Sequence, residues 1–188
     1  MGMEGIKQSL HGEWRSIAPE LRPSTLKSAD GVIKPFYLAR VFRYATDDTF
    51  ELEITNFADP YGNTPLVSMI IKGHVAWQGD HPIAADAHKV HFIADMAYDV
   101  TPLAQGFADL LNQVASTGFN RWELNRTQSI LRKHFAPFGL AEGQTFGEYD
   151  LIYIYDTMLF WGARHVDGRG FDTEDNRPTN LQIPLVRA

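Results

Sequence analysis

Apolar and polar positions alternate with a period of two along residues 36–100. This is the pattern of half-buried antiparallel strands, because successive side chains of a strand point to opposite faces. Turn-forming residues interrupt the alternation at Asp47-Asp48, at residues 56–65 and at residues 79–87. We therefore expect four long strands in an antiparallel meander, with the rest of the chain arranged around it.

One face of the predicted meander carries large apolar and aromatic side chains. Its members on the third and fourth strands are Val67, Met69, Ile71, Gly73, Val75 and Trp77, then Val90, Phe92, Ala94, Met96, Tyr98 and Val100. A sheet that curves around such a face encloses either a packed core or a cavity lined by aromatic groups. The pattern alone is compatible with both.

The period changes after residue 100. Thr101 suits a helix N-cap and Pro102 the first helical position. An apolar stripe follows at helical spacing, made by Leu103, Phe107, Leu110, Leu111 and Val114. We predict one α-helix over about residues 102–117, a short helical lead-in at residues 1–10, a strand at residues 120–126 and a buried hairpin over residues 149–162.

A Gly-x-Trp sequence, Gly12 to Trp14, begins the likely first strand. In lipocalin-like barrels a Trp in this position closes one end of the barrel, often beneath a basic side chain. A core Trp at a strand start would give the same pattern. The predicted fold is mainly β, a calycin- or lipocalin-like curved antiparallel sheet or half-open barrel with one α-helix. At 188 residues we expect one domain, 1–188.

Composition excludes several classes of function. A formal net charge of −6 without a basic cluster argues against a nucleic-acid partner. No apolar run approaches the roughly 20 residues of a membrane span, and residues 1–10 lack a signal-peptide core. The sequence contains no cysteine, which excludes disulfides and thiolate metal sites. We expect a cytoplasmic protein with no membrane span.

The seven histidines do not form a recognisable metal motif. His88 and His91 are an odd number of positions apart in a strand pattern, so their side chains point to opposite faces. His74 could join either from the neighbouring strand, but no carboxylate stands at ligand spacing. No nucleophile-elbow sequence is present. We predict neither a metal nor a cofactor.

Arg40 is the most informative charged residue, because it lies on the apolar face between Leu38 and Phe42. A buried guanidinium needs a carboxylate, carbonyl groups or a bound anion. It could pair with an internal carboxylate or stack on Trp14, or it could anchor the polar head of an apolar ligand. The aromatic residues that could line a pocket, or simply fill a core, are Trp77, Tyr98, Trp122 and Tyr153.

Several separated segments together resemble the adenomatosis polyposis coli down-regulated domain family. They are residues 12–16, 20–23, 38–44, 59–60, 65, 72–73, 85–90, 110–112, 148–151, 159–162, 177–179 and 184–186. The resemblance implies a calycin-like sheet with a hydrophobic pocket, and it implies that Arg40 and His88 are polar groups of that pocket. Animal members are similar to secreted or membrane-anchored antagonists of lipid-modified Wnt signals.

The Wnt role is not carried over to this chain, which has one domain copy, no cysteines and no expected anchor or leader. We expect instead a carrier or sensor that binds a small apolar or lipid-like molecule. The alternative is an acid–base enzyme, with His88 or His74 as general base and Arg40 stabilising negative charge. A protein-interaction module without a cavity is the third interpretation. Sheet edges and the tail at residues 181–186 also leave a homodimer open.

Overall fold

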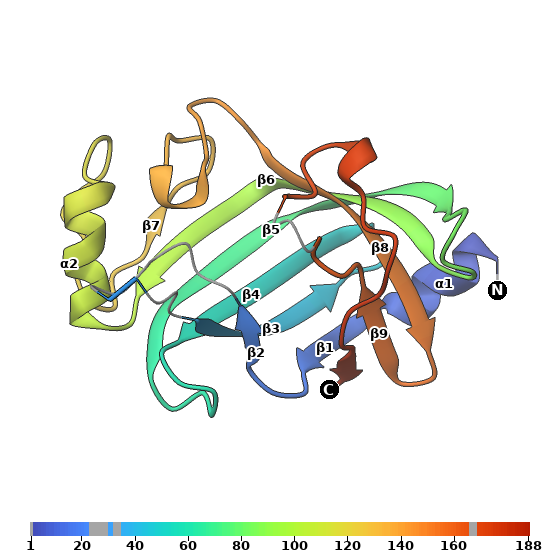
Figure 1. Cartoon of the computed structure of the whole chain (residues 1–188). Helices are drawn as coiled ribbons and strands as arrows, with labels where there is room; N and C mark the ends of the chain where they lie inside the picture. The colour runs from blue at the N-terminus through green and yellow to red at the C-terminus, as the bar shows by residue number, and fades with distance from the viewer. Residues whose placement is uncertain (1, 23–29, 32–34, 166–168) are drawn as a thin grey trace.

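The structure, a computed structural model, describes residues 2–22, 30–31, 35–165 and 169–188 (Figure 1). The described chain is mainly β, as predicted. The helices are α1 (Met3–Leu10) and α2 (Gln105–Val114), with short 3₁₀ turns η1 (Ala136–Phe138) and η2 (Glu174–Asn176). The strands are β1 (Gly12–Ser16), β2 (Glu20–Arg22), β3 (Phe36–Tyr44), β4 (Thr49–Phe57), β5 (Pro65–Asp80), β6 (His88–Pro102), β7 (Gln128–Ser129), β8 (Phe146–Tyr155), β9 (Met158–Trp161) and β10 (Leu185–Arg187).

Eight of the described strands close into an antiparallel barrel. The predicted meander is present as β3–β4–β5–β6, and β8, β9, β10 and β1 continue the sheet from β6. Pairing of β1 with β3, in which Trp14 lies opposite Phe42, closes the ring. In Figure 1, β8 and β9 cross in front of the right-hand part of the meander. The predicted hairpin of residues 149–162 is confirmed as β8 and β9, which turn at Asp156.

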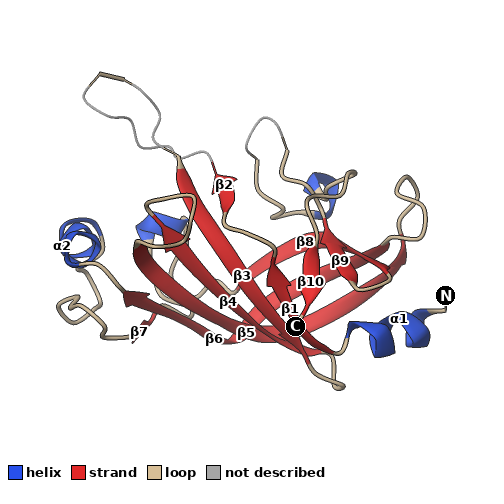
Figure 2. Ribbon diagram, turned by 90° about the horizontal axis from the view of Figure 1, so that it is seen from below, coloured by secondary structure: helices blue, strands red, loops and turns tan. Residues whose placement is uncertain are grey.

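The Gly-x-Trp prediction is confirmed at one end of the barrel. The Trp14 side chain is fully buried, and its indole Nε1 donates to the carbonyl of Leu10 at 2.7 Å. The guanidinium of Arg187 lies over the indole at 4.3 Å. Figure 2 shows α1 at this end of the barrel and α2 at the other end. Trp14 therefore joins the first strand, the last strand and α1.

A bulge in β6 corrects the prediction for Met96, which was expected on the inner face but is 54% exposed. Lys72 pairs with Ala97 and His74 with Ile93, so Gly73 alone lies opposite three residues of β6. A Cβ atom on Gly73 would lie 1.7 Å from the carbonyl oxygen of Ile93. Because Gly73 has no side chain, the backbone of β6 can lie close to β5 at this point, and the bulge turns Met96 outward.

Helix α2 begins later than predicted. Strand β6 continues through Pro102, and the amides of Leu103 and Ala104 both donate to the carbonyl of Leu66, which keeps this segment on the sheet. The helix buries Ala108 and Leu111, whereas the predicted core positions Leu110 and Val114 are 37% and 50% exposed. No described helix is long and apolar enough to span a membrane.

The strand predicted at residues 120–126 is absent, since these described residues form no ladder. The side-chain amide of Asn112 on α2 replaces a neighbouring strand. It accepts from the Trp122 amide and donates to the Trp122 carbonyl, each at 2.8 Å. The backbone at Trp122 is fixed by this helix side chain and not by a neighbouring strand. The period-two pattern of residues 120–126 therefore gave a wrong prediction.

Aromatic side chains fill the barrel at the α1 end. Phe42 stacks on Tyr44 at 4.6 Å between ring centroids and meets the edge of Trp161 at 4.2 Å. Phe50 and Phe92 complete the cluster, at 5.5 and 5.4 Å from Phe42. This half of the interior is a packed core of aromatic side chains.

Candidate functional site

Arg40 lies on the inner face of β3, opposite Ile54, at the border of the aromatic core. Its side chain is only 10% exposed. The guanidinium lies over the indole of Trp161 at 5.3 Å, rather than over Trp14. Its Nη1 is 3.3 Å from Glu20 Oε1, which is ion-pair distance, but the two groups are not aligned for a hydrogen bond. Nη1 is therefore a buried donor without a hydrogen bond.

Two inward-facing carboxylates on β8 share this interior with Arg40. Glu148 lies opposite Phe92 and Asp150 opposite Val90, so both project from the same face of the strand. Glu20 pairs with Arg22 at 2.7 Å as well as with Arg40. We call the group the interior charged cluster; it consists of Arg22, Arg40, Glu20, Glu148 and Asp150, with the exposed Arg164 at its edge.

Asp150 is 5% exposed and connects β8 to β9. Its Oδ1 accepts from the backbone amides of Leu151 at 2.7 Å and Gly162 at 2.9 Å. Burial raises the pKa of this carboxyl to about 7, with a further increase from the charge of Glu148. The two amides and Arg40 act in the opposite direction. Asp150 is thus a fold-supporting residue whose charge changes near neutral pH.

The charge of Arg40 persists at neutral pH. Burial lowers its pKa to about 10, and the nearby Glu20 partly offsets that decrease. Burial also raises the pKa of Glu148, while Arg164 and Arg40 lower it. Near pH 7 Asp150 is therefore partly protonated, while Arg40 keeps its charge. Partial protonation of Asp150 leaves less negative charge near Arg40 than a fully ionised cluster would have.

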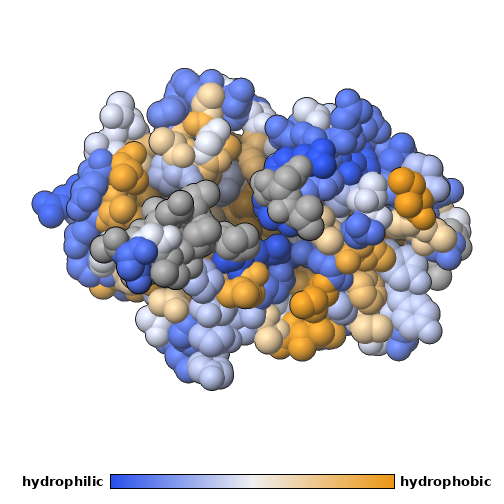
Figure 3. All heavy atoms as spheres, viewed as in Figure 1, coloured by the Kyte–Doolittle hydropathy of each residue, from blue (hydrophilic) through white to orange (hydrophobic). Residues whose placement is uncertain are grey.

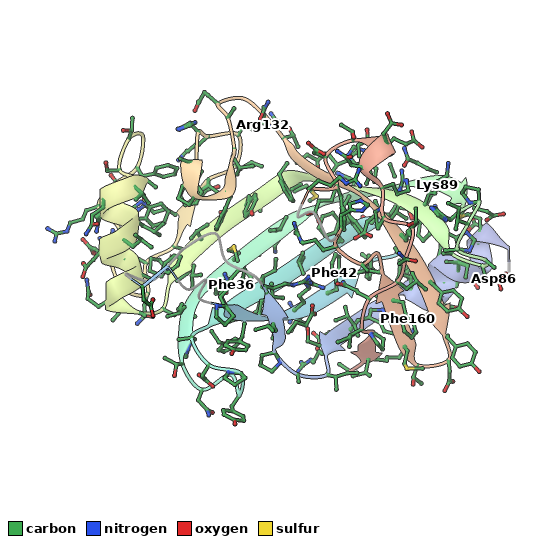
Figure 4. All side chains as sticks on the ribbon, viewed as in Figure 1. Phe36, Phe42, Asp86, Lys89, Arg132 and Phe160 are labelled. Atoms are coloured by element: carbon green, nitrogen blue, oxygen red, sulfur yellow. The ribbon has the colours of Figure 1, made fainter. Side chains whose placement is uncertain are left out.

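Apolar side chains continue from Arg40 along the inner face toward α2. Leu38 and Ile54 are half-buried, and Met69 and Tyr98 are each 6% exposed. Figure 4 labels Phe42 and Phe36 near the two ends of β3, and Arg40 lies between them in the strand. Figure 3 shows the surface hollowed near the centre of the same view, with hydrophobic residues at depth. The cluster thus adjoins a partly open apolar face.

Trp77 and His88 lie at the α1 end, away from Arg40's contacts. Trp77 Nε1 donates to Asp48 Oδ1 at 3.0 Å, and its ring meets the His88 ring at 6.4 Å. His88 is 5% exposed, and its Nδ1 is 3.0 Å from an oxygen of Asp80. The described contacts of His88 do not include Arg40.

The other predicted residues are also dispersed. His74 is half exposed on the outer face, with Nδ1 at 2.9 Å from Asp95 Oδ1. Trp122 is buried under α2, where its Nε1 donates to the Ala115 carbonyl. Tyr153 lies on the face of β8 opposite to the carboxylates, 5.8 Å from Phe160, which Figure 4 labels. Of the predicted set, Arg40 and Tyr98 border the apolar inner face.

Glu148 and Asp150 were not predicted from the sequence to be site residues. The available signal is two carboxylates separated by one residue, next to an otherwise apolar hairpin, since that spacing puts both on one face. Glu20 and Arg22 gave no such signal, because their strand is short. Pro23, which follows them in the family-like segment, lies outside the described residues.

The chain matches no model of a known protein family. The resemblance to the adenomatosis polyposis coli down-regulated domain stays a prediction. The described residues contain no group of three or more histidines and carboxylates able to hold a metal ion. The interior charged cluster and the apolar face beside it are therefore the candidate functional site.

Proposed function

We propose that the protein binds a small hydrophobic or lipid-like molecule with an anionic head, as a carrier or sensor. The observation that carries this proposal is the buried guanidinium of Arg40, whose Nη1 has no hydrogen-bond partner. Leaving such a donor unsatisfied costs free energy, which an anionic ligand would recover. A cytoplasmic location is part of the proposal, and a homodimer stays a prediction.

The surroundings of Arg40 support a ligand with two different ends. The guanidinium is held in place by Trp161 and Glu20, so binding would cost little side-chain ordering. Leu38 and Ile54 offer a half-buried apolar surface next to it for the ligand's body. The family resemblance favours the same kind of pocket, although it names no head group for this chain.

An acid–base enzyme is the second candidate. It is supported by Asp150, a carboxyl group with a pKa of about 7 close enough to feel the charge of Arg40. The predicted bases, His88 and His74, contact Asp80 and Asp95 instead of this cluster. Because two backbone amides occupy Oδ1 of Asp150, its geometry favours support of the fold over catalysis.

The test compares dodecanoic acid with dodecanol by isothermal titration calorimetry. We expect Arg40→Met to weaken binding of the acid about ten- to hundredfold, which corresponds to the loss of one charge-assisted hydrogen bond. Binding of dodecanol should change little, because methionine preserves the apolar surface. The matched control is Arg43→Met on the same strand, since Arg43 pairs with Glu13 and Glu51 on the outer face. A folded Arg40→Met variant that binds the acid as the wild type does would refute the proposal.

A further inference from the structure

A second buried polar atom without a partner lies on the same inner face as Arg40. Asn56 of β4 is opposite Leu38 on β3 and Val67 on β5. Its side-chain oxygen Oδ1 is buried and makes no hydrogen bond. An amide oxygen in this state lacks a donor, just as Nη1 of Arg40 lacks an acceptor.

The register fixes how these two residues are placed. Arg40 is opposite Ile54, and Asn56 is two positions further along β4, so the two are diagonal neighbours across the strand pair. The Cα atoms of such diagonal neighbours are separated by roughly 7–8 Å. Leu38 and Ile54 occupy the other corners of this square and are apolar. A positive donor and an uncharged acceptor are thus separated by apolar surface.

We propose that Asn56 determines ligand specificity by accepting a hydrogen bond from a hydroxyl group on the ligand's apolar body. The ligand is then an amphiphilic acid that carries a hydroxyl several carbons from its carboxylate. This inference rests on the proposed function, since it assumes that Arg40 holds the carboxylate. It adds the chemical group that distinguishes this ligand from a simple fatty acid.

The polarity of the unpaired atom selects the ligand group. The side-chain oxygen of Asn56 accepts hydrogen bonds. An ether or a ketone on the ligand has no hydrogen to donate and would leave this oxygen unpaired, whereas a hydroxyl can donate to it. A fatty acid without the hydroxyl would cover Asn56 with methylene groups and keep its oxygen unsatisfied. Sites that hydrogen-bond a ligand hydroxyl discriminate against analogues that lack it for this reason.

The experiment measures binding of dodecanoic acid and a positional series of hydroxydodecanoic acids to the full chain by calorimetry. We expect at least one hydroxy isomer to bind the wild type about tenfold more tightly than dodecanoic acid. Asn56→Leu should abolish that preference while binding dodecanoic acid at least as tightly as the wild type. Asn56→Val provides a second, smaller replacement if the leucine variant does not fold.

Thr55→Val is the matched control, because residue 55 projects to the outer face of the same strand, and it should keep the preference. If no isomer is preferred while dodecanoic acid binds in an Arg40-dependent way, the inference is wrong and the proposed function stands. A preference that persists in Asn56→Leu also overturns it, because the ligand hydroxyl would then be recognised by another group. If the wild type binds no acid of the series, the proposed function itself fails.

Discussion

Arg40 keeps its charge inside the barrel because its surroundings replace part of the lost hydration. The indole of Trp161 faces the guanidinium at 5.3 Å, and Glu20 supplies a carboxylate at 3.3 Å. Neither contact gives Nη1 a hydrogen bond. An arginine held in this way has lost water without full compensation, which is the condition under which an incoming anion binds well.

Asp150 leads to a prediction about pH and stability. Its pKa of about 7 in the folded protein exceeds the ordinary carboxyl value, so between about pH 4 and 7 the folded state binds more protons than the unfolded state. The free energy of unfolding must then fall as pH rises through that window. We expect Asp150→Asn, which keeps an Oδ1 acceptor for both amides, to lessen the decrease between pH 5 and 8 by on the order of 2 kcal/mol.

Chemical denaturation at several pH values checks this prediction. The informative quantity is the difference between variant and wild type, because groups that are not coupled to Asp150 titrate equally in both. Asp86→Asn is a suitable control, since Figure 4 places Asp86 at the periphery, far from the barrel interior. Parallel pH profiles for the wild type and Asp150→Asn would show that Asp150 is ionised throughout.

At the residue scale, the sequence was sufficient to place Arg40 on the inner face of the sheet but not to name its partners. An arginine between Leu38 and Phe42 in a period-two pattern must face inward, and it does. The partner expected from the sequence was Trp14 or an internal carboxylate. In the structure the Arg40 guanidinium pairs with the carboxylate of Glu20 and lies over the indole of Trp161 rather than that of Trp14. That choice depends on how the barrel closes, which local pattern does not encode.

The β6 bulge leads to a prediction at the scale of the element. Alanine at position 73 would place Cβ 1.7 Å from the Ile93 carbonyl, and backbone of a central strand cannot move aside easily. We expect Gly73→Ala to destabilise the protein by about 3 kcal/mol or more, as other severe overpacking does. Thermal or urea unfolding measures the loss.

Gly106→Ala is the matched control for this substitution. Nothing lies within 4 Å of a Cβ at Gly106 in α2, so alanine should leave stability unchanged or raise it by up to about 1 kcal/mol. A Gly73→Ala variant as stable as Gly106→Ala would mean that β6 does not cross so closely over residue 73.

Regular alternation predicted the strands well, whereas departures from it depended on contacts distant in sequence. The meander follows from period-two patterning, and the hairpin follows from a nearly continuous apolar run that is interrupted at Asp156-Thr157. Met96 turns outward only because a glycine on the neighbouring strand permits a bulge. Trp122 leaves the strand pattern because Asn112 of α2 binds its backbone. Each error comes from a tertiary contact that overrides a local preference.

At the scale of the whole molecule, the barrel is divided along its length. Aromatic packing around Phe42 and Trp161 fills the interior near α1. Within the described residues, the inner face nearer α2 has half-buried apolar groups together with the unpaired polar atoms of Arg40 and Asn56. The first region supports the closed barrel, and the proposed binding site lies in the second.

Arg187 helps to close the end of the barrel near α1, and this role can be tested. Arg187 covers the indole of Trp14 at 4.3 Å and donates to the carbonyls of Ser9 and His11 at the end of α1. Replacing it with methionine keeps an apolar cover but removes the charge and both hydrogen bonds. We expect Arg187→Met to cost about 1–2 kcal/mol of stability and to accelerate hydrogen exchange in α1 selectively.

Arg15→Met is the control. Arg15 is exposed and pairs with Glu13, so replacing it should leave the protection of α1 unchanged. If α1 exchanges at the same rate in both variants, Arg187 does not hold the helix, and its other contacts fix it to the barrel: the buried Ile6 and Leu10, the hydrogen bond from Trp14 and the ion pair of Lys7 with Asp48.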